Sequence, residues 1–357
     1  MDFQWLAIIP ILSLLMLVHE AGHFFTARRA GIVVQEFGFG LPPRIFGYER
    51  NGVIFSLNLI PFGAFVKMLG EEDPSAPGSF ASKSKLTRFI VLAAGSGMNF
   101  LTAAIVFALA FASGWPTPVP NEVQIGQVAA GSPAEAAGLR SGDLVLQMNG
   151  QPVTSTQQFQ QITRDSGGNP IAIDVRRGDQ AVTATVTPRV NPPPGQGAVG
   201  VSIQAPTRPT QHGPLESIGL GFMRAASVVG FTLAAPVLYF QGLMPGEMLR
   251  PIGLPGMAQV TSQAVDASIQ SGYWFPILVM TGTFSAGLAV ANMLPIPALD
   301  GGRIFFILIE AVRGRRISPE REGLVHFVGI VVLIALMLLI SFNDITNPFG
   351  TVDFGIR

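Results

Sequence analysis

The chain has 357 residues, enough for more than one domain, and its 22 basic and 22 acidic residues give a net charge of zero. A neutral chain has no electrostatic reason to bind a polyanion, so we expect no nucleic-acid partner. Only 12% of the residues are charged and the mean hydropathy is +0.45, which is unusual for a soluble protein. The chain has no cysteine, so any zinc site must use histidine and carboxylate ligands.

Residues 1–27 form the first apolar segment, and they contain the sequence His-Glu-Ala-Gly-His at residues 19–23. The apolar run is long enough to cross a bilayer, and its lack of a basic start argues against a removable signal peptide. Residues four apart share one face of a helix, so His19 and His23 can bind one metal ion together. Glu20 stays close enough to reach a water on that metal. This is the arrangement of zinc-dependent peptide hydrolysis.

By itself the His-Glu-x-x-His pattern is equally compatible with a histidine pair at a helix end near the membrane interface. Its position changes this balance, because ionisable groups in a lipid-spanning segment are costly unless they are paired and functional. Three such groups lie within five residues of this segment, which favours a metal site.

Residues 28–88 precede the second span and include unusually apolar extended pieces. We expect a β-hairpin that dips into the membrane beside the first helix. The alternative is a small β-meander on the membrane surface. The pieces are Ile45–Tyr48, Val53–Ile60 and Ala64–Met68, with a turn at Asn51–Gly52 and a break at Pro61–Gly63.

Residues 89–113 form the second predicted transmembrane helix, and Gly95-Ser96-Gly97 within it allows a neighbouring helix to approach closely. Asn99 either makes a packing hydrogen bond or faces the metal site.

Residues 120–205 form the one clearly soluble domain. The run Gly131–Asp143, followed by Asn149-Gly150, resembles a bacterial, circularly permuted PDZ domain. Such a domain can bind an extended peptide as an added strand, or it can merely block access to the site. The expected strands are Val123–Val128, Asp143–Asn149, Ile171–Arg176 and Ala181–Pro188, with one helix at Thr156–Thr163.

The rest of the chain alternates between apolar and polar segments. In the linker 206–272, the apolar run Leu215–Leu243 is interrupted by Arg224 and Pro236, and it is either an interfacial amphipathic helix, which we favour, or another span. His212 receives no role, and His326 is interpreted as an interfacial histidine in preference to a metal ligand. The remaining segments are transmembrane helix 273–299, cytoplasmic segment 300–322, transmembrane helix 323–342 and tail 343–357.

Basic residues near membrane ends fall in Arg28–Arg88 and Arg303–Arg321, which predicts that both segments are cytoplasmic. Both chain termini and the PDZ domain are then extracytoplasmic. The first and third spans run in the same direction and bring His19 and Asp300 to a similar depth. This holds only if Leu215–Leu243 does not cross the membrane.

A zinc ion needs a third protein ligand, and Asp300 is the best candidate. The neighbouring Pro295, Pro297 and Gly301-Gly302 permit a tight turn that presents the side chain inward. The alternative is that Asp300 caps a helix beginning near Gly302. Spacing alone leaves both interpretations open.

These features together resemble the site-2 protease family of intramembrane zinc metalloproteases, in particular its regulator of sigma-E protease branch, over essentially the whole chain. The third span supplies the sequence Asn-x-x-Pro-x-Pro-x-Leu-Asp-Gly-Gly at residues 292–302. The resemblance implies one catalytic Zn²⁺ held by His19, His23 and Asp300, with Glu20 as general base and Asn292 positioning the substrate. It implies cleavage of single-span membrane proteins, such as anti-sigma factors or signal-peptide remnants, in the bacterial cell membrane.

Two stretches depart from the family pattern, and a single PDZ domain is visible where some relatives have two. Residues 94–100 read Ala-Gly-Ser-Gly-Met-Asn-Phe where the family commonly has Gly-Pro, and Gly63-Ala64-Phe65 replaces a Gly-Gly-Tyr type sequence. The metal site is unaffected, but any inference about substrate choice is weakened.

The expected fold is therefore a polytopic α-helical membrane protein with about four transmembrane helices, a membrane-associated β-hairpin and an inserted extracytoplasmic PDZ domain. We also expect the Val53–Met68 edge, through Phe55 and Leu57, to hold unwound substrate as an added strand, with Asn99 nearby. Two other functions are a catalytically silent PDZ membrane adaptor, which predicts a decayed metal site, and a zinc transporter, which needs neither a general base nor a PDZ domain.

Overall fold

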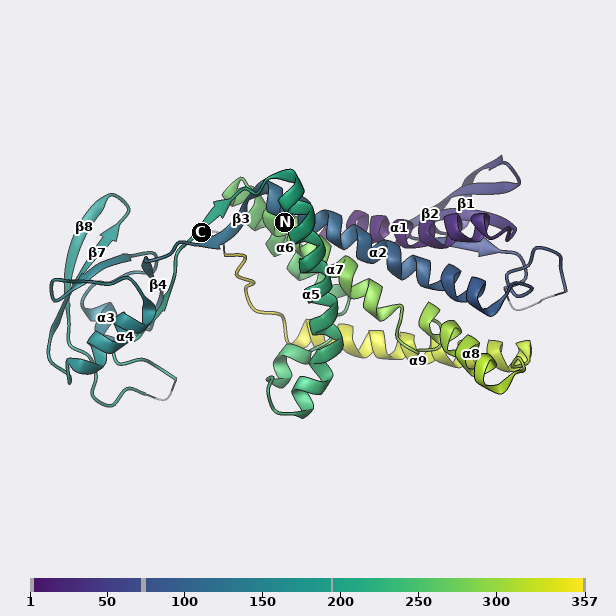
Figure 1. Ribbon diagram of the computed structural model, residues 1–357. Coiled ribbons are helices and arrows are strands. Elements are labelled where there is room, and N and C mark those ends of the chain that lie inside the picture. Colours follow the sequence, from purple (N-terminus) through teal and green to yellow (C-terminus); the bar gives the residue numbers. More distant parts are fainter. Residues whose placement is uncertain (1–2, 72–74, 194, 356–357) are drawn as a thin grey trace. The chain divides into compact units, whose positions relative to one another are not determined.

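The structure, a computed structural model, describes residues 3–71, 75–193 and 195–355 and divides into two compact units (Figure 1). The helical unit joins the residues before Trp115 to residues 211–354. The β-sheet unit comprises Trp115–Thr210 and the last residues of the chain.

Helices build most of the helical unit, and five stretches among the described residues are long and apolar enough to cross a membrane. These stretches are Phe3–Arg29, Lys85–Gly114, Pro214–Phe240, Phe275–Met293 and Glu320–Thr346. The helices are η1 (Phe3–Ala7), α1 (Ile8–Arg29), α2 (Lys85–Gly114), α5 (Pro214–Phe240), η2 (Gly246–Leu249), α6 (Leu254–Ser271), α7 (Phe275–Ala291), α8 (Asp300–Arg313) and α9 (Pro319–Thr346).

Helix α2 is the common neighbour of α1, α5 and α7, and glycines let these helices approach it closely. A Cβ at Gly22 of α1 would lie 2.4 Å from the carbonyl oxygen of Ala94, and one at Gly221 of α5 would lie 2.4 Å from that of Ala104. Backbones without intervening side chains are the usual packing of membrane helices. The centre of α2 is consequently enclosed on three sides.

The segment from α5 to the start of α6 begins and ends at one end of the helical unit. It begins beside the end of α2, where the His212 N–H donates to the Phe111 carbonyl (3.2 Å). It ends at Gly253, whose N–H donates to Asp344 (2.8 Å) near the end of α9. Helix α6 then packs against η1, the short helix that directly precedes α1.

Strands β1 (Val34–Arg50) and β2 (Val53–Met68) form a long hairpin whose Asn51–Gly52 turn lies where the sequence predicts it. The hairpin curls, so that residues 36–39 pair with 64–67 on one side and with 54–57 on the other. The expected break at Pro61–Gly63 does not end β2, because the chain turns there within one continuous strand. Residues 34–44, which the sequence did not predict as a strand, belong to β1.

The hairpin lies along α1 and reaches the middle of that helix. The Ser13 hydroxyl donates to the Pro61 carbonyl (3.2 Å) and accepts from the Gly63 N–H (3.4 Å), and Arg28 donates to the Asn51 carbonyl (3.2 Å). One end of the hairpin therefore lies at the end of α1 and the other lies beside its centre. At that inner end Leu59 is 58% exposed, which suits contact with lipid.

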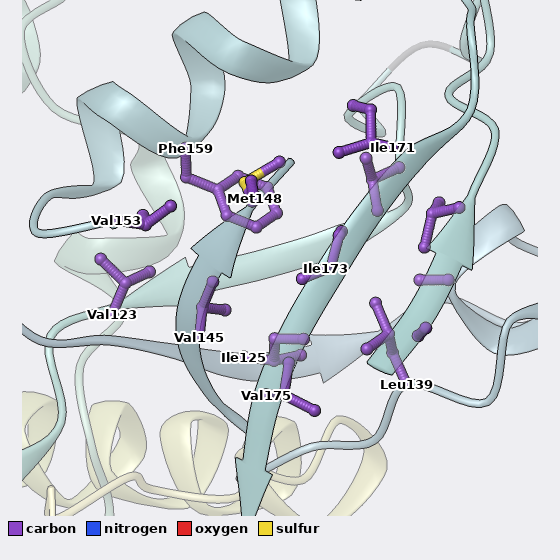
Figure 2. Packing of buried hydrophobic residues seen from close by; sticks show 14 residues of the cluster. Val123, Ile125, Leu139, Val145, Met148, Val153, Phe159, Ile171, Ile173 and Val175 are labelled. Atoms are coloured by element: carbon purple, nitrogen blue, oxygen red, sulfur yellow. The ribbon is translucent and has the colours of Figure 1, made fainter. Parts of the chain in front are cut away.

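The β-sheet unit contains a sheet of strand order β8-β7-β5-β4-β9, with β6 on β5, and a separate β3–β10 ribbon. Aliphatic side chains from four strands pack beneath Phe159 of α4 (Figure 2). Strands β3, β6, β9 and β10 and helix α3 are additional to the elements expected from the sequence. The elements are β3 (Trp115–Pro118), β4 (Val123–Val128), α3 (Pro133–Ala136), β5 (Leu144–Met148), β6 (Gln151–Pro152), α4 (Thr156–Asp165), β7 (Ile171–Arg177), β8 (Gln180–Val186), β9 (Val201–Gln204) and β10 (Thr207–Thr210).

Asp143 explains why the Gly131–Asp143 run ends in an acidic residue. Its carboxylate accepts two hydrogen bonds from the Arg177 guanidinium (2.8 and 2.7 Å) and one from the Arg140 N–H (2.8 Å). Burial alone would raise the pKa of Asp143, but the hydrogen bonds from Arg177 and Arg140 lower it below its usual value. The charged carboxylate thus fastens this turn to β7.

Candidate active site

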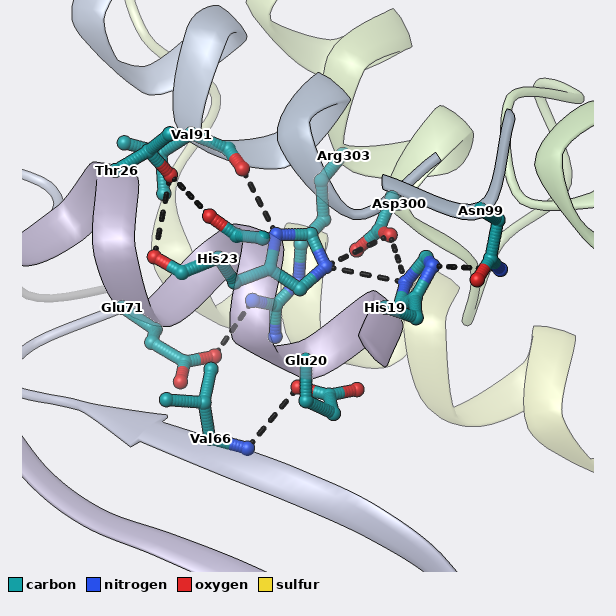
Figure 3. Close-up of polar contacts among 11 residues, drawn as sticks. His19, Glu20, His23, Thr26, Val66, Glu71, Val91, Asn99, Asp300 and Arg303 are labelled. Atoms are coloured by element: carbon teal, nitrogen blue, oxygen red, sulfur yellow. Dashed lines mark hydrogen bonds and ion pairs between the residues drawn. The ribbon is translucent and has the colours of Figure 1, made fainter. Parts of the chain in front are cut away.

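Three metal-ligating side chains converge where α1 meets the start of α8. The Nε2 atoms of His19 and His23 lie 3.1 Å apart, and Asp300 Oδ2 lies 3.0 Å from the first and 3.1 Å from the second (Figure 3). Both histidines are buried. The structure therefore brings His23 and Asp300 together with His19, although His19 and Asp300 are 281 positions apart in the sequence.

The geometry and chemistry of this triangle fit a zinc ion. Tetrahedral zinc with bonds of about 2.0–2.1 Å requires ligand atoms separated by about 3.3 Å, slightly wider than the observed spacing. Imidazole nitrogens and a carboxylate oxygen are ligands that zinc accepts. A small outward movement of the three atoms would make room for the ion.

Helix α2 orients both imidazole rings. The Val91 carbonyl can only accept, so the His23 Nδ1–H donates to it (2.8 Å) and Nε2 is left to face the metal position. The Asn99 amide lies 3.3 Å from His19 Nδ1, and the Asn99 Oδ1 has no partner among the described residues. A half-turn of the amide brings that oxygen to accept a hydrogen bond from His19 Nδ1–H, which leaves His19 Nε2 to face the metal position. Of the two alternatives for Asn99, the geometry supports the one that faces the metal site.

Gly95 leaves the space that the two imidazoles occupy. A Cβ at this position would lie 2.5 Å from His23 Nε2 and 2.7 Å from His19 Nε2. Any larger side chain would displace the ligand atoms themselves. By contrast, a Cβ at Gly97 would meet nothing within 4 Å.

Glu20 lies beside the histidines and is anchored by the hairpin. One of its carboxylate oxygens accepts the Val66 N–H (3.0 Å), and it offers an oxygen within 4.8 Å of both imidazoles (Figure 3). Val66 pairs with Phe37 of β1 on one side only. Its N–H donates to Glu20 and therefore points away from the sheet. The outer edge of residues 64–68 therefore faces the site.

Asp300 is presented by a tight turn between α7 and α8. Helix α8 begins at Asp300 itself, and the carboxylate contacts the histidines, so the alternative of a cap for a helix beginning near Gly302 is wrong. The Gly301 N–H donates to the Asn292 carbonyl (2.7 Å). A Cβ at Gly301 would lie 2.1 Å from the Leu294 carbonyl oxygen, so this turn requires glycine.

Two residues expected at the substrate edge, Phe55 and Leu57, lie elsewhere in the hairpin, and the role expected for Asn292 stays a prediction. Phe55 pairs with both Phe37 and Tyr48, and Leu57 pairs with Phe39 and Phe46, so neither lies on an open sheet edge. The expectation that they form the free edge is wrong, because the hairpin curls and residues 54–57 become an inner strand that is paired on both sides. Asn292 contributes its backbone carbonyl to the turn.

Several residues at the site were not assigned a role from the sequence. They include Val66, Glu71, Val91 and Arg303, and Gly95 was expected only to allow helix approach. The glycine was visible as a small residue on α2. No sequence signal pointed to the backbone groups of Val66 and Val91, because their contacts depend on how the hairpin and α2 pack against α1.

Comparison with known proteins agrees with this geometry. The sequence matches peptidase family M50 over residues 7–336, which is most of the chain. The chain belongs to peptidase family M50. The site-2 protease resemblance is thereby confirmed, this M50 member is a peptidase, and its apolar helices identify it as an integral membrane protein.

Relatives of this M50 peptidase align over nearly their full lengths. A candidate zinc metalloprotease of Clostridium perfringens is 36% identical over 94% of this chain and 96% of its own. The zinc metalloprotease RasP of Shouchella clausii is 29% identical over 97% and 99%, and the regulator of sigma-W protease RasP of Bacillus subtilis is 27% identical over 96% and 98%.

One solved structure overlaps a small part of the M50 peptidase. A PDZ domain of an SdrC-like protein from Listeria monocytogenes covers 24% of this chain and 92% of its own, with 21% identity and a TM-score of 0.21. A likeness this slight carries no argument about the fold.

The first prediction concerns Gly95 of the M50 peptidase. We expect Gly95→Ala to weaken zinc binding about 10- to 100-fold, the scale seen when the surroundings of metal ligands are disturbed. Competition with a chromophoric chelator measures the affinity. Gly97→Ala is the matched control on the same helix and should bind zinc as the parent protein does. Equal affinities of the two variants would show that the space at Gly95 is not needed.

Proposed function

We propose that this M50 peptidase is an intramembrane zinc metalloprotease that hydrolyses peptide bonds in or beside the transmembrane segments of single-span membrane proteins. The observation that carries the proposal is the convergence of His19, His23 and Asp300 beside Glu20 on a helix apolar enough to span a bilayer. The names of the relatives support zinc as the metal.

The residues of the site have separate roles in metal binding and proton transfer. His19, His23 and Asp300 hold the zinc, which when bound supplies a Lewis acid that polarises a peptide carbonyl and activates water. Glu20 accepts a proton from the attacking water and passes it to the leaving amine. The Val66 N–H holds one oxygen of Glu20 (3.0 Å), so that the other is directed at the water.

A membrane helix must be locally unwound before its peptide bonds can react, because its backbone groups are all engaged. Our proposal is that residues 64–68 receive the unwound segment as an added strand. The outer side of this edge faces the active site. Glu20 and Glu71 already accept its Val66 and Met68 N–H groups, so the substrate would pair through the remaining backbone groups of the edge. This edge replaces Phe55 and Leu57 as the proposed substrate contact.

Both termini and the PDZ domain are proposed to lie outside the cytoplasm, with the chain in the bacterial cell membrane. The segment Pro214–Gly253 begins and ends at one end of the helical unit, which supports an interfacial or re-entrant α5. Helix α7 then runs from that end toward Asp300.

The second prediction tests this topology. A reporter fused just before Tyr273, at the start of α7, is expected to be active on the extracytoplasmic side, because α5 makes no net crossing. Alkaline phosphatase and green fluorescent protein fusions at that position give opposite readouts. A cytoplasmic reading would contradict the placement.

The β-sheet unit resembles a PDZ domain, and we propose that it binds an extended peptide along β9. That strand is at one edge of the sheet, and a cavity of about 260 Å³ lies between it and α4. Phe159, Thr163 and Ile203 line the cavity. Apolar side chains beside a free edge suit a peptide added as a strand.

The substrate class includes regulators such as anti-sigma factors. The name of the Bacillus subtilis relative, regulator of sigma-W protease, supports a role in regulated intramembrane proteolysis. Signal-peptide remnants share the chemistry of a single apolar helix and belong to the same class.

The third prediction tests catalysis. Glu20→Gln is expected to lower the rate of cleavage of a reconstituted single-span substrate about 10²- to 10⁴-fold, because it removes the general base while leaving the zinc ligands in place. A chelator should abolish cleavage by the parent protein. Glu49→Gln, which changes an exposed carboxylate on the same hairpin, is the control and should cleave normally. Normal cleavage by the Glu20→Gln protein would rule out Glu20 as the general base, whereas a parent protein that does not cleave would favour a silent adaptor or a transporter.

A further inference from the structure

Glu71 joins the edge of β2 to the helix that carries Asp300. One of its carboxylate oxygens accepts the Met68 N–H (3.3 Å), and the other accepts a hydrogen bond from the Arg303 guanidinium (2.5 Å; Figure 3). Arg303 lies three residues after Asp300 in the first turn of α8, so both side chains emerge from the same face of the helix. The carboxylate thus links the end of β2 to the first turn of α8.

The same edge is held at a second point by Glu20. Val66 and Met68 are alternate residues, and each directs its N–H out of the sheet toward a different glutamate. Glu20 belongs to α1, with the histidines, and Glu71 pairs with Arg303 of α8, beside Asp300. The edge is therefore attached separately to both parts of the chain that supply metal ligands.

The contacts at Val66 and Met68 fix both the position of the edge along the strand direction and its distance from the metal ligands. Residues in a strand advance by about 3.3 Å, and a slip of one residue turns every side chain to the other face. A peptide paired with the edge is located relative to the metal ligands only as accurately as the edge itself. A loss of the Glu71–Arg303 contact would leave the edge attached to α1 but no longer to the helix that carries Asp300.

We propose that Glu71 and Arg303 are positioning residues that set the register between the substrate-holding edge and the metal ligands, and thereby select which peptide bond is cut. The inference rests on the proposed function and deepens it. The two side chains are 25% and 31% exposed, and the contact between them is the link between the edge and α8.

The experiment uses the full-length protein in lipid nanodiscs with a single-span substrate, and mass spectrometry identifies the new termini. Arg303→Met and Glu71→Gln are each expected to spread cleavage over neighbouring bonds and to reduce cleavage at the original bond about 10-fold or more. Arg303→Lys, which keeps the cation, should restore the original bond. The double variant Glu71→Gln/Arg303→Met should be no worse than the poorer single variant, because the two residues act as a unit.

A matched control comes from the same hairpin. Arg44 and Glu36 form an exposed ion pair (2.7 Å) that involves neither α8 nor the outer edge, and Arg44→Met should cut the parent bond alone. Thermal unfolding of each variant shows whether it is folded.

The outcomes separate the two proposals. Cleavage by Arg303→Met and Glu71→Gln at the parent bond alone, with only yield or unfolding temperature lowered, would overturn the register role and leave a structural one. Equal spreading by Arg44→Met would overturn it as well. A parent protein that does not cleave would instead reject the proposed function, and a Glu20→Gln protein that cleaves normally would reject the role of Glu20 as general base.

Discussion

The structure depends on the close packing of α2 against the two histidines of α1. Ionisable groups in an apolar helix are tolerated only when neighbouring groups satisfy them, and α2 provides both the space and the hydrogen-bond partners. Gly95 leaves room for the ligand nitrogens, the Val91 carbonyl fixes one ring, and Asn99 faces the other. Small residues along α2 admit α5 and α7 at contact distance as well, so one helix organises both the bundle and the metal site.

The β-hairpin meets a related constraint, because it lies along an apolar helix and backbone polar groups in apolar surroundings must be satisfied within the protein. Its own curled pairing satisfies most of them, and side chains from α1 and from Glu71 take up several that remain. Ser13 holds the inner turn at Pro61 and Gly63, and Glu20 holds Val66. Satisfying the backbone and positioning the general base are thus achieved by the same contact.

Local patterns in the sequence were sufficient for much of the site. Residue spacing on one helix predicts the histidine pair, and the Asn51–Gly52 turn was recognisable by its residues. Asp300 was predicted as their partner from charge bias and span parity, and the structure brings it against both histidines. What could not be predicted depends on pairing between distant segments. The curl of the hairpin places Phe55 and Leu57 on an inner strand that is paired on both sides, and the Glu71–Arg303 contact joins residues separated by 232 positions. For Asn99, the sequence left two alternatives, and choosing between them required the position of the His19 ring.

Side chains from α1 and α8 are proposed to form one zinc site together. The most direct test is the zinc content per chain of purified full-length protein, measured by mass spectrometry of the metal for the parent, Asp300→Asn, His23→Ala and Glu20→Gln. The account predicts one zinc in the parent and in Glu20→Gln, and strongly reduced zinc in Asp300→Asn and His23→Ala, because these two lose ligands. Full zinc content in Asp300→Asn would contradict the account, since α8 would then contribute no ligand.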